Sequence, residues 1–210
     1  MNKRWLLLPI VMLVIAGLAC AAPGGSALYR DNFSNSSGDW CVDSDDTSST
    51  DYSGGKFVIE VIETEWYVWC NPDQSFEAIH LEVTAENANG TPDTVFGMMC
   101  HYQFLDEFYY VGITSEGDYT IRLFIDDADD ILAEGVSDDI PVNAASYRLG
   151  MDCAEGRIAL YVDGTLIDEV SDSTFTSGDI GLYAWSGDEV PAEIRYDDLE
   201  VTAFGADTDS

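Results

Sequence analysis

From residue 28 onward, apolar residues alternate with polar ones in short runs. The run 56–62 places Phe57, Ile59 and Val61 on one face. Comparable runs, rich in β-branched and aromatic residues, occupy 95–102, 108–114, 119–125, 157–162 and 180–185. A period of two residues predicts strands that bury one face, so these runs are expected to be strands of antiparallel sheets.

Turn signals separate the runs. Asp163-Gly164 stands between two alternating runs, as a two-residue hairpin requires, and 115–118 predicts a second hairpin connection. The segment 127–134 is the one place where a short helix is expected, of about two turns. The close spacing of the strands predicts an all-β, two-sheet antiparallel sandwich in one domain, residues 28–202, followed by a flexible tail, 203–210.

The first residues read as an export signal. A basic start, residues 1–4, precedes fifteen uncharged residues, 5–19, which end in small side chains before Cys20. This layout resembles a bacterial lipoprotein signal, which implies removal of residues 1–19, acylation of Cys20 and a tether over 20–27. Two alternatives remain at this point: signal cleavage near Ala22, or an uncleaved membrane anchor.

The charge is strongly negative. The chain has 210 residues, with 40 acidic against 8 basic residues and a formal net charge of −32. Removal of the signal takes away Lys3 and Arg4 and no acid, so the mature chain carries six basic residues and a net charge of −34. This charge excludes nucleic acid as a partner and a polybasic contact with anionic lipid. The expected membrane contact is therefore the N-terminal lipid alone.

The five cysteines agree with export. If Cys20 carries lipid, Cys41, Cys70, Cys100 and Cys153 remain, and an even number can close two disulfides in an oxidising compartment. Four cysteines allow three pairings, which the count alone does not distinguish.

Several sequence blocks, in their order and spacing, resemble the concanavalin A-like lectin/glucanase (LamG-like) jelly-roll domains of bacterial lipoproteins, which are related to the 3-keto-disaccharide hydrolase domain group. The blocks are 31–34 with 38–40, 97–102, 108–110, 116–119, 153–164, 178–183 and 196–201. The resemblance implies two stacked sheets of roughly six strands each. It also places Cys100 and Cys153 on neighbouring strands, which favours the pairs Cys100–Cys153 and Cys41–Cys70. Trp40 and Trp69, beside the second pair, are expected in the core.

The resemblance leaves activity open. Glucanases of this fold carry catalytic carboxylates on one strand as Glu-x-Asp-x-x-Glu, and the chain lacks that spacing, because Glu60 and Glu63 fall on opposite faces of a strand. No catalytic residue is therefore assigned. The expected function is a non-catalytic, lipid-anchored binding module for carbohydrate or a cell-envelope polymer. A 3-keto-glycoside hydrolase-like enzyme and a structural or assembly protein of the envelope are the alternatives.

Four residues are expected to bind the ligand. Tyr183 and Trp185 alternate with a presumed core face and should point outward, where aromatic rings can stack on sugars. Arg157 should point outward in the same sense, and His101 is expected on a sheet face next to Cys100.

A calcium site is expected where the first and last strands meet, at Asp31 and Asp197, since hard cations prefer carboxylate and carbonyl oxygens. The alternative is that these carboxylates cap strand ends or pair with Arg30 and Arg195. The predicted location is the cell envelope, on the extracytoplasmic or cell-surface side.

Overall fold

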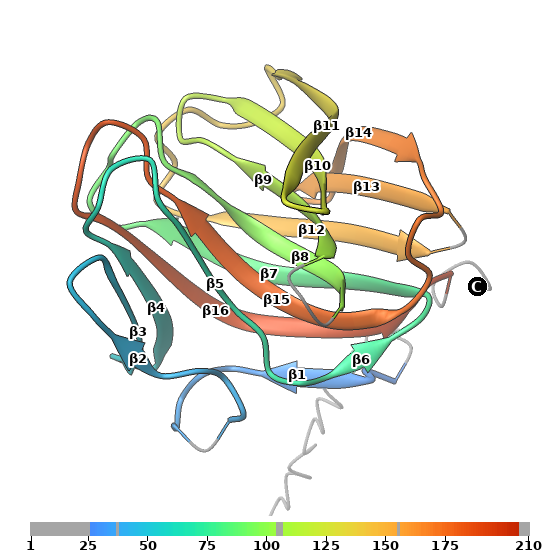
Figure 1. Cartoon of the computed structure of the whole chain (residues 1–210), viewed down its shortest axis with the longest axis horizontal. Helices are drawn as coiled ribbons and strands as arrows, with labels where there is room; N and C mark the ends of the chain where they lie inside the picture. Colours follow the sequence, from blue (N-terminus) through green and yellow to red (C-terminus); the bar gives the residue numbers. More distant parts are fainter. Residues whose placement is uncertain (1–25, 37, 104–106, 155, 206–210) are drawn as a thin grey trace, which may run out of the picture.

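The computed structural model describes residues 26–205 except 37, 104–106 and 155. The expected signal peptide, Cys20 and most of the expected tether lie outside the described residues, as do residues 206–210. Two antiparallel sheets stack face to face (Figure 1), which confirms the predicted sandwich.

One sheet has nine strands. They are β1 (Tyr29–Asp31), β2 (Asp43–Ser44), β3 (Ser48–Ser53), β4 (Lys56–Val61), β7 (Ile79–Asn87), β12 (Tyr147–Ala154), β13 (Arg157–Val162), β14 (Thr165–Ser171) and β16 (Ala192–Ala203). Their order is β14-β13-β12-β7-β16-β4-β3-β2, and the first strand, β1, pairs with the last, β16. The strand β16 ends one residue beyond the predicted domain boundary.

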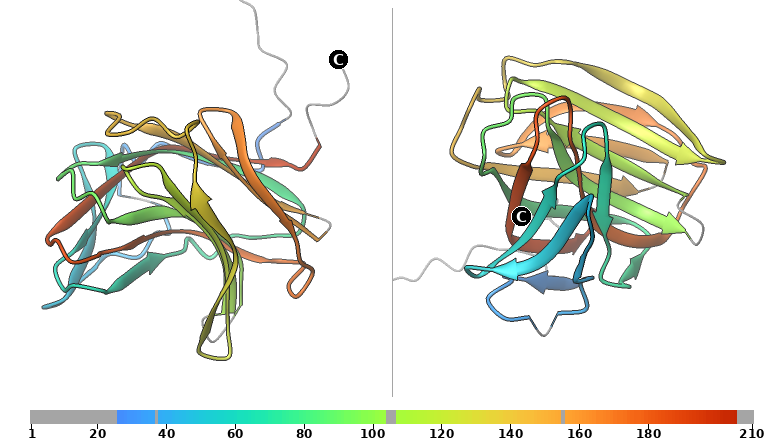
Figure 2. Two further views of the ribbon diagram at one scale, coloured as in Figure 1. Left: turned by 90° about the horizontal axis from the view of Figure 1, so that it is seen from above. Right: turned by 60° about the vertical axis from the view of Figure 1, so that its left-hand side comes forward.

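The other sheet has seven strands. They are β5 (Tyr67–Cys70), β6 (Ser75–Phe76), β8 (Val95–Gln103), β9 (Glu107–Ile113), β10 (Asp118–Ile125), β11 (Ala128–Val136) and β15 (Gly178–Trp185). The order is β11-β10-β9-β8-β15-β5, with β6 beside β15. Figure 2 shows the two sheets from above and from the side; their β9–β11 and β13–β14 ends stay in contact, since Tyr119 Oη of β10 donates to Asp168 of β14 at 2.8 Å.

The core fills the space between the sheets. Each of the six runs predicted as strands is a strand, and the inward faces follow the predicted alternation except at a β-bulge in β8, between Cys100 and Gln103. Phe57, Ile59 and Val61 of β4 are fully buried, as are Ile180 and Leu182 of β15. Alternation alone therefore located the core face of these strands correctly.

The short helix expected over 127–134 is wrong. These residues belong to β11, which pairs with β10 along its length, Ile125 opposite Ala128. Asp126 and Asp127 form the two-residue turn with φ of 52° and 60°, the positive values that a type I′ hairpin requires. Pairing with β10 therefore overrides the local helix propensity of the segment.

Both disulfides are present. Cys100–Cys153 joins β8 of the seven-stranded sheet to β12 of the nine-stranded sheet, with the Cα atoms 6.6 Å apart. Cys41–Cys70 joins the segment before β2 to the end of the edge strand β5, with Cα atoms 5.7 Å apart. Each cross-link therefore ties one sheet to the other, as expected of a protein from an oxidising, extracytoplasmic compartment.

No helix in the described part of the chain is long and apolar enough to cross a membrane.

Candidate functional site

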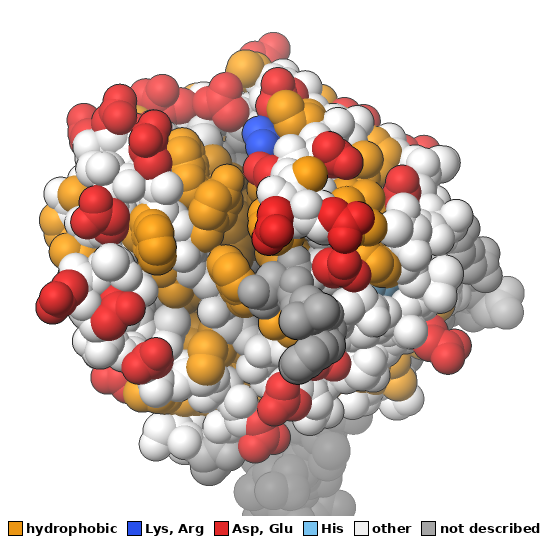
Figure 3. Space-filling model, in the orientation of Figure 1, with side chains coloured by type: hydrophobic (Ala, Val, Ile, Leu, Met, Phe, Trp, Pro, Cys, Tyr) orange, Lys and Arg blue, Asp and Glu red, His pale blue; other side chains and the backbone are white. Residues whose placement is uncertain are grey.

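The free face of the seven-stranded sheet carries a second cluster of apolar side chains. On β9, Tyr109 and Val111 point to the core, whereas Phe108 and Tyr110 point to the free face. The cluster also contains Met99 of β8 and Tyr183 of β15. Figure 3 shows these hydrophobic side chains as a hollowed patch surrounded by acidic residues.

An aromatic cavity of about 340 Å³ opens in this patch. Its lining residues are Trp66, Tyr67, Trp69, Phe108, Tyr110, Phe124 and Tyr183. Phe108 packs at the centre of the cluster, with its ring centroid 5.5 Å from that of Phe124 and 5.8 Å from that of Trp69. Trp66 and Tyr67 remain 45% and 42% exposed, so the cavity is open to a ligand from outside.

A second cavity of about 200 Å³, called the polar cavity below because charged residues also line it, adjoins the first and shares Tyr67, Tyr110 and Tyr183 with it. It adds Trp185 and the charged side chains Asp118, Arg122 and Glu134. The two cavities together are called the groove below. Apolar walls in one half and charged groups in the other are typical of small-molecule sites.

Asp129 of β11 connects the two halves of the groove. Its carboxylate accepts hydrogen bonds from Tyr110 Oη at 2.7 Å and from Arg122 Nη1 at 2.7 Å. Tyr67 Oη, from the opposite edge strand, donates to the same carboxylate at 3.4 Å. Asp129 thereby fixes the orientation of three side chains that line the groove.

The floor of the groove contains an unsatisfied hydroxyl. Tyr183 is 3% exposed and its Oη has no hydrogen-bond partner among the described residues. The hydroxyl lies over Gly112, where an added Cβ would come within 2.0 Å of it. Buried hydroxyls without a partner are uncommon, and a ligand or water in the groove would supply the missing partner.

The groove tyrosines are neutral donors at physiological pH. Burial raises the pKa of Tyr183 well above its usual value. Burial and the hydrogen bond to Asp129 raise the pKa of Tyr110, and burial and the charge of Asp129 raise that of Tyr67. All three hydroxyls therefore keep their protons, which Tyr67 and Tyr110 donate to Asp129.

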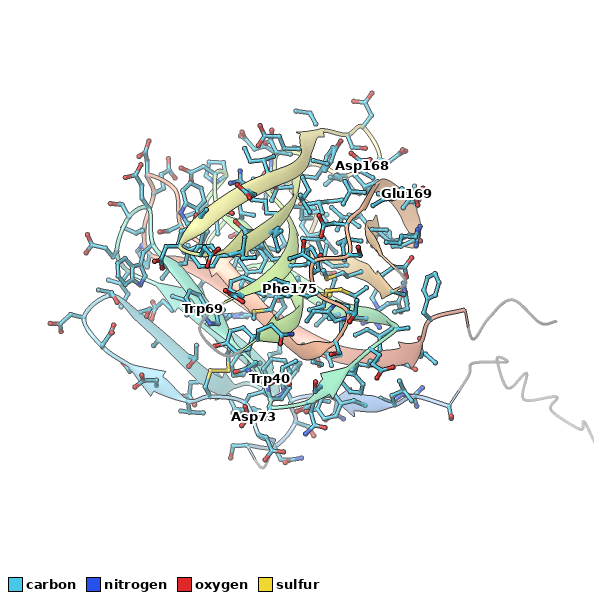
Figure 4. The ribbon with its side chains drawn as sticks, turned by 45° about the vertical axis from the view of Figure 1, so that its right-hand side comes forward. Trp40, Trp69, Asp73, Asp168, Glu169 and Phe175 are labelled. Atoms are coloured by element: carbon cyan, nitrogen blue, oxygen red, sulfur yellow. A yellow bond between two sulfur atoms is a disulfide. The ribbon has the colours of Figure 1, made fainter. Side chains whose placement is uncertain are left out.

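Sequence analysis located only part of this groove. Tyr183 and Trp185 lie on the predicted face of β15, and the Trp185 ring lies 6.3 Å from that of Tyr67. Trp40 is buried in the core as expected, but Trp69 is not a core residue: it is partly buried against the free-face cluster (both are labelled in Figure 4). On the edge strand β5, Val68 and Cys70 take the core face and leave Tyr67 and Trp69 outside.

Phe108, Tyr110 and Phe124 were not predicted as site residues. The available signal is that β9 is apolar on both faces, since a strand with one solvated face would alternate apolar with polar residues.

Arg157 lies on β13 of the nine-stranded sheet, whereas Trp185 lies on β15 of the seven-stranded sheet. It points outward from β13 as predicted, where Nη2 donates to Tyr161 Oη at 2.9 Å and Nε donates to Glu169 Oε2 at 2.7 Å. It also pairs with the buried Asp152, whose carboxylate accepts from Tyr161 at 2.7 Å. Figure 4 shows Glu169 and Trp69 on different parts of the molecule. Arg157 thus does not line the groove.

His101 leaves the free face because of a β-bulge. The register of β8 against β9 shifts between Cys100 and Gln103, and His101 has a φ of 51°. The side chain is buried, with Nε2 donating to the carbonyl of Glu77 at 2.7 Å and the ring 6.2 Å from that of Tyr109. The predicted alternation fails here, because the bulge adds a residue and turns the imidazole toward the core side.

Asp31 and Asp197 lie where β1 meets β16, as predicted. Asp31 Oδ1 accepts from the backbone N–H of Phe33 and Asp197 Oδ1 from that of Asp198, both at 2.8 Å. Each carboxylate keeps one oxygen outside these contacts. Asp31 also lines a wide depression of about 960 Å³, whose Arg30 and Arg148 are already paired with Glu200 and Glu82. Calcium binding there stays a prediction.

In the described part of the chain, one group of three residues lies close enough to share a metal ion: Cys100, His101 and Cys153. Its two cysteines are bonded to each other. The aromatic cavity itself has no carboxylate among its described lining residues.

No protein-family model and no curated protein matches the chain. Solved structures do match. A carbohydrate-binding module, CBM66, from Bacillus subtilis is 16% identical with a TM-score of 0.65, over 79% of this chain and 96% of the module. A Bacillus subtilis protein of unknown function with a galectin-like fold is 15% identical with a TM-score of 0.67, over 85% of this chain and 96% of that protein.

A Bacillus licheniformis β-glucanase is 16% identical with a TM-score of 0.63, over 85% of this chain and 98% of the enzyme. At such low identity these likenesses establish the fold and no activity. The chain has the concanavalin-like lectin/glucanase jelly-roll fold that its sequence resembles.

Proposed function

We propose that this protein is an exported, lipid-anchored and non-catalytic module that binds carbohydrate, or a carbohydrate polymer of the cell envelope, in the groove. The observation that carries the proposal is an open aromatic cavity whose floor holds the unpartnered Tyr183 hydroxyl. Sugars offer one apolar ring face for stacking and hydroxyls for hydrogen bonds, and the groove has a group for each.

Two of the compared structures support this reading of the fold, since one is named a carbohydrate-binding module and another a β-glucanase. Binding without hydrolysis is favoured because the sequence lacks the Glu-x-Asp-x-x-Glu spacing that puts catalytic carboxylates on one face of a glucanase strand. Cys20 is the proposed site of the lipid, and this lipid is the proposed membrane contact.

A glycan array tests the proposal. The mature protein should bind a subset of glycans, and Trp66→Ala and Trp185→Ala should each weaken binding about tenfold or more, because each removes a stacking surface. Phe204→Ala is the matched control, since this partly exposed aromatic residue lies beside Arg157 on the other sheet. The array is run with calcium and with a chelator, so that the predicted calcium at Asp31 and Asp197 is tested together with the ligand.

Four results would each contradict part of the proposal. Equal binding by the tryptophan variants and the wild type would place the ligand outside the groove. Turnover of a 3-keto glycoside would establish an enzyme. Absence of binding to any glycan on the array would favour a structural role. Mass spectrometry that finds an unmodified thiol at Cys20 in the native protein would contradict the proposed lipid anchor.

A further inference from the structure

The groove is negatively charged although it contains an arginine. Three carboxylates, of Asp118, Asp129 and Glu134, face or contact the polar cavity, against the single guanidinium of Arg122. Arg122 pairs with Asp129 at 2.7 Å and with Glu134 at 3.3 Å, so no positive group is left for a ligand. The local formal charge is −2.

No other described cation can offset this charge. The remaining Lys and Arg residues of the described chain are Arg30, Lys56, Arg148, Arg157 and Arg195. All five belong to strands of the nine-stranded sheet, and each forms an ion pair with an acid there. Arg122 is therefore the one Lys or Arg of the seven-stranded sheet within the described residues, and the field at the groove is negative.

Both halves of the groove suit a positively charged group on an organic ligand. The faces of the aromatic rings carry the negative part of a quadrupole and attract cations, and the carboxylates of the polar cavity attract them further. A bare metal ion suits the groove less well, because the three acids are not within reach of one ion: the described chain has one such three-residue group, and it lies elsewhere.

We propose that the glycan is an amino sugar polymer or oligomer that carries free, protonated amines. This inference rests on the proposed function and specifies its ligand. One sugar ring stacks in the aromatic cavity, an ammonium group lies in the polar cavity between Asp118 and Glu134, and a ligand oxygen accepts the hydrogen bond of Tyr183. Tyr183, a residue only 3% exposed whose hydroxyl has no partner among the described residues, marks a ligand site independently of the charges.

Calorimetric titration separates the ligand classes. The probes are hexamers of β-1,4-linked glucosamine, of N-acetylglucosamine and of galacturonate, at about pH 5.5, where the glucosamine amines are protonated. In about 50 mM salt the glucosamine hexamer should bind at least about tenfold more tightly than the acetylated one. In about 500 mM salt the difference should fall to about threefold or less, because salt screens exposed charges.

A charge-neutralising variant tests the residues. Asp118→Asn combined with Glu134→Gln should cost about tenfold in affinity for the glucosamine hexamer and no more than about threefold for the acetylated hexamer. The matched control, Asp46→Asn with Asp51→Asn, removes two exposed charges near and on β3 of the other sheet and should change neither. Glu134→Lys, at an exposed position, gives a second variant should the first fail to fold.

The outcomes distinguish the two proposals. Equal or tighter binding of the acetylated or the galacturonate hexamer would overturn the amino-sugar inference and leave carbohydrate binding standing. An effect of the control variant as large as that of the groove variant would also overturn it. No binding of any glycan, in these titrations and on the array, would overturn both.

Discussion

Two buried polar groups show how single residues bear on function and stability. Tyr183 Oη and His101 Nδ1 are both buried without a hydrogen-bond partner among the described residues. An unsatisfied buried group costs about 1–3 kcal/mol. Tyr183 lines the groove, so a ligand can recover this cost, whereas His101 is enclosed on the core side of its strand.

Tyr183→Phe should therefore act on stability and on binding in opposite directions. Removal of the unpartnered hydroxyl should raise the free energy of unfolding by about 1 kcal/mol, because no hydrogen bond is lost in the free protein. Glycan affinity should fall about fivefold, because the ligand loses a donor. Urea unfolding measures the change in stability and calorimetric titration the change in glycan affinity of the same variant. A loss of stability with unchanged affinity would contradict the role of Tyr183 as a donor to the ligand.

His101 should make the protein less stable in acid. Burial lowers its pKa in the folded state below the usual 6.5, outweighing the hydrogen bond to the backbone of Glu77. As the pH falls below about 6.5, the His101 imidazole binds a proton in the unfolded chain but stays neutral in the folded chain. The free energy of unfolding therefore decreases in acid.

Urea unfolding at about pH 7.5 and pH 5.5 measures the effect of His101. The loss between the two should be smaller in His101→Gln than in the wild type, while the titration of the carboxylates is common to both. An identical pH dependence in the two proteins would contradict the prediction.

Individual elements differ in how much the sequence could predict. The strands β4, β8 and β15 were predicted because alternation is a local property. The strand β11 was not, because its pairing with β10 is a contact between segments, and Asp126-Asp127 is an unusual I′ turn. The bulge at His101 and the exposure of Trp69 on an edge strand also depend on neighbouring strands.

The turn between β10 and β11 gives a prediction for an element. Replacing Asp126-Asp127 by Asn-Gly should raise the free energy of unfolding by about 1 kcal/mol, since these residues tolerate positive φ better than Asp. Thermal unfolding tests this. The same exchange at Asp45-Asp46, where no positive φ occurs, should give no gain. A gain there of equal size would contradict the turn assignment.

The edge strand β5 carries Tyr67 and Trp69 and is held to the other sheet by Cys41–Cys70. The double variant Cys41→Ala/Cys70→Ala should weaken glycan binding about tenfold, because one wall of the groove loses its attachment. Cys100→Ala/Cys153→Ala is the control for binding, since this bond lies in the core behind the groove. Equal binding losses in both variants would argue against a specific effect on β5.

At the scale of the whole molecule, two stacked sheets are stabilised by a core and two cross-links against a large negative charge. The fold class was predicted from alternation and resemblance. The pairing of strands was not, and this explains why Arg157 was grouped with Trp185 although they lie on different sheets. Residues brought together by topology are not visible in local sequence.

The Cys100–Cys153 bond should contribute most to global stability. It closes a loop across 53 residues, and the chain-entropy model gives about 4 kcal/mol for such a loop. Chemical denaturation of Cys100→Ala/Cys153→Ala should show a loss of this size. A loss below about 1 kcal/mol would contradict the view that this bond holds the sheets together.

The most direct test of the carbohydrate groove uses the tryptophan indole signals. The described residues include four tryptophans: Trp66, Trp69 and Trp185 line the groove, and Trp40 lies in the core. In NMR titration with the glucosamine hexamer, or with the strongest glycan on the array, the three groove signals should shift and the Trp40 signal should not. A complex in which Trp40 moves alone, or in which none of the three groove signals moves, would contradict the account.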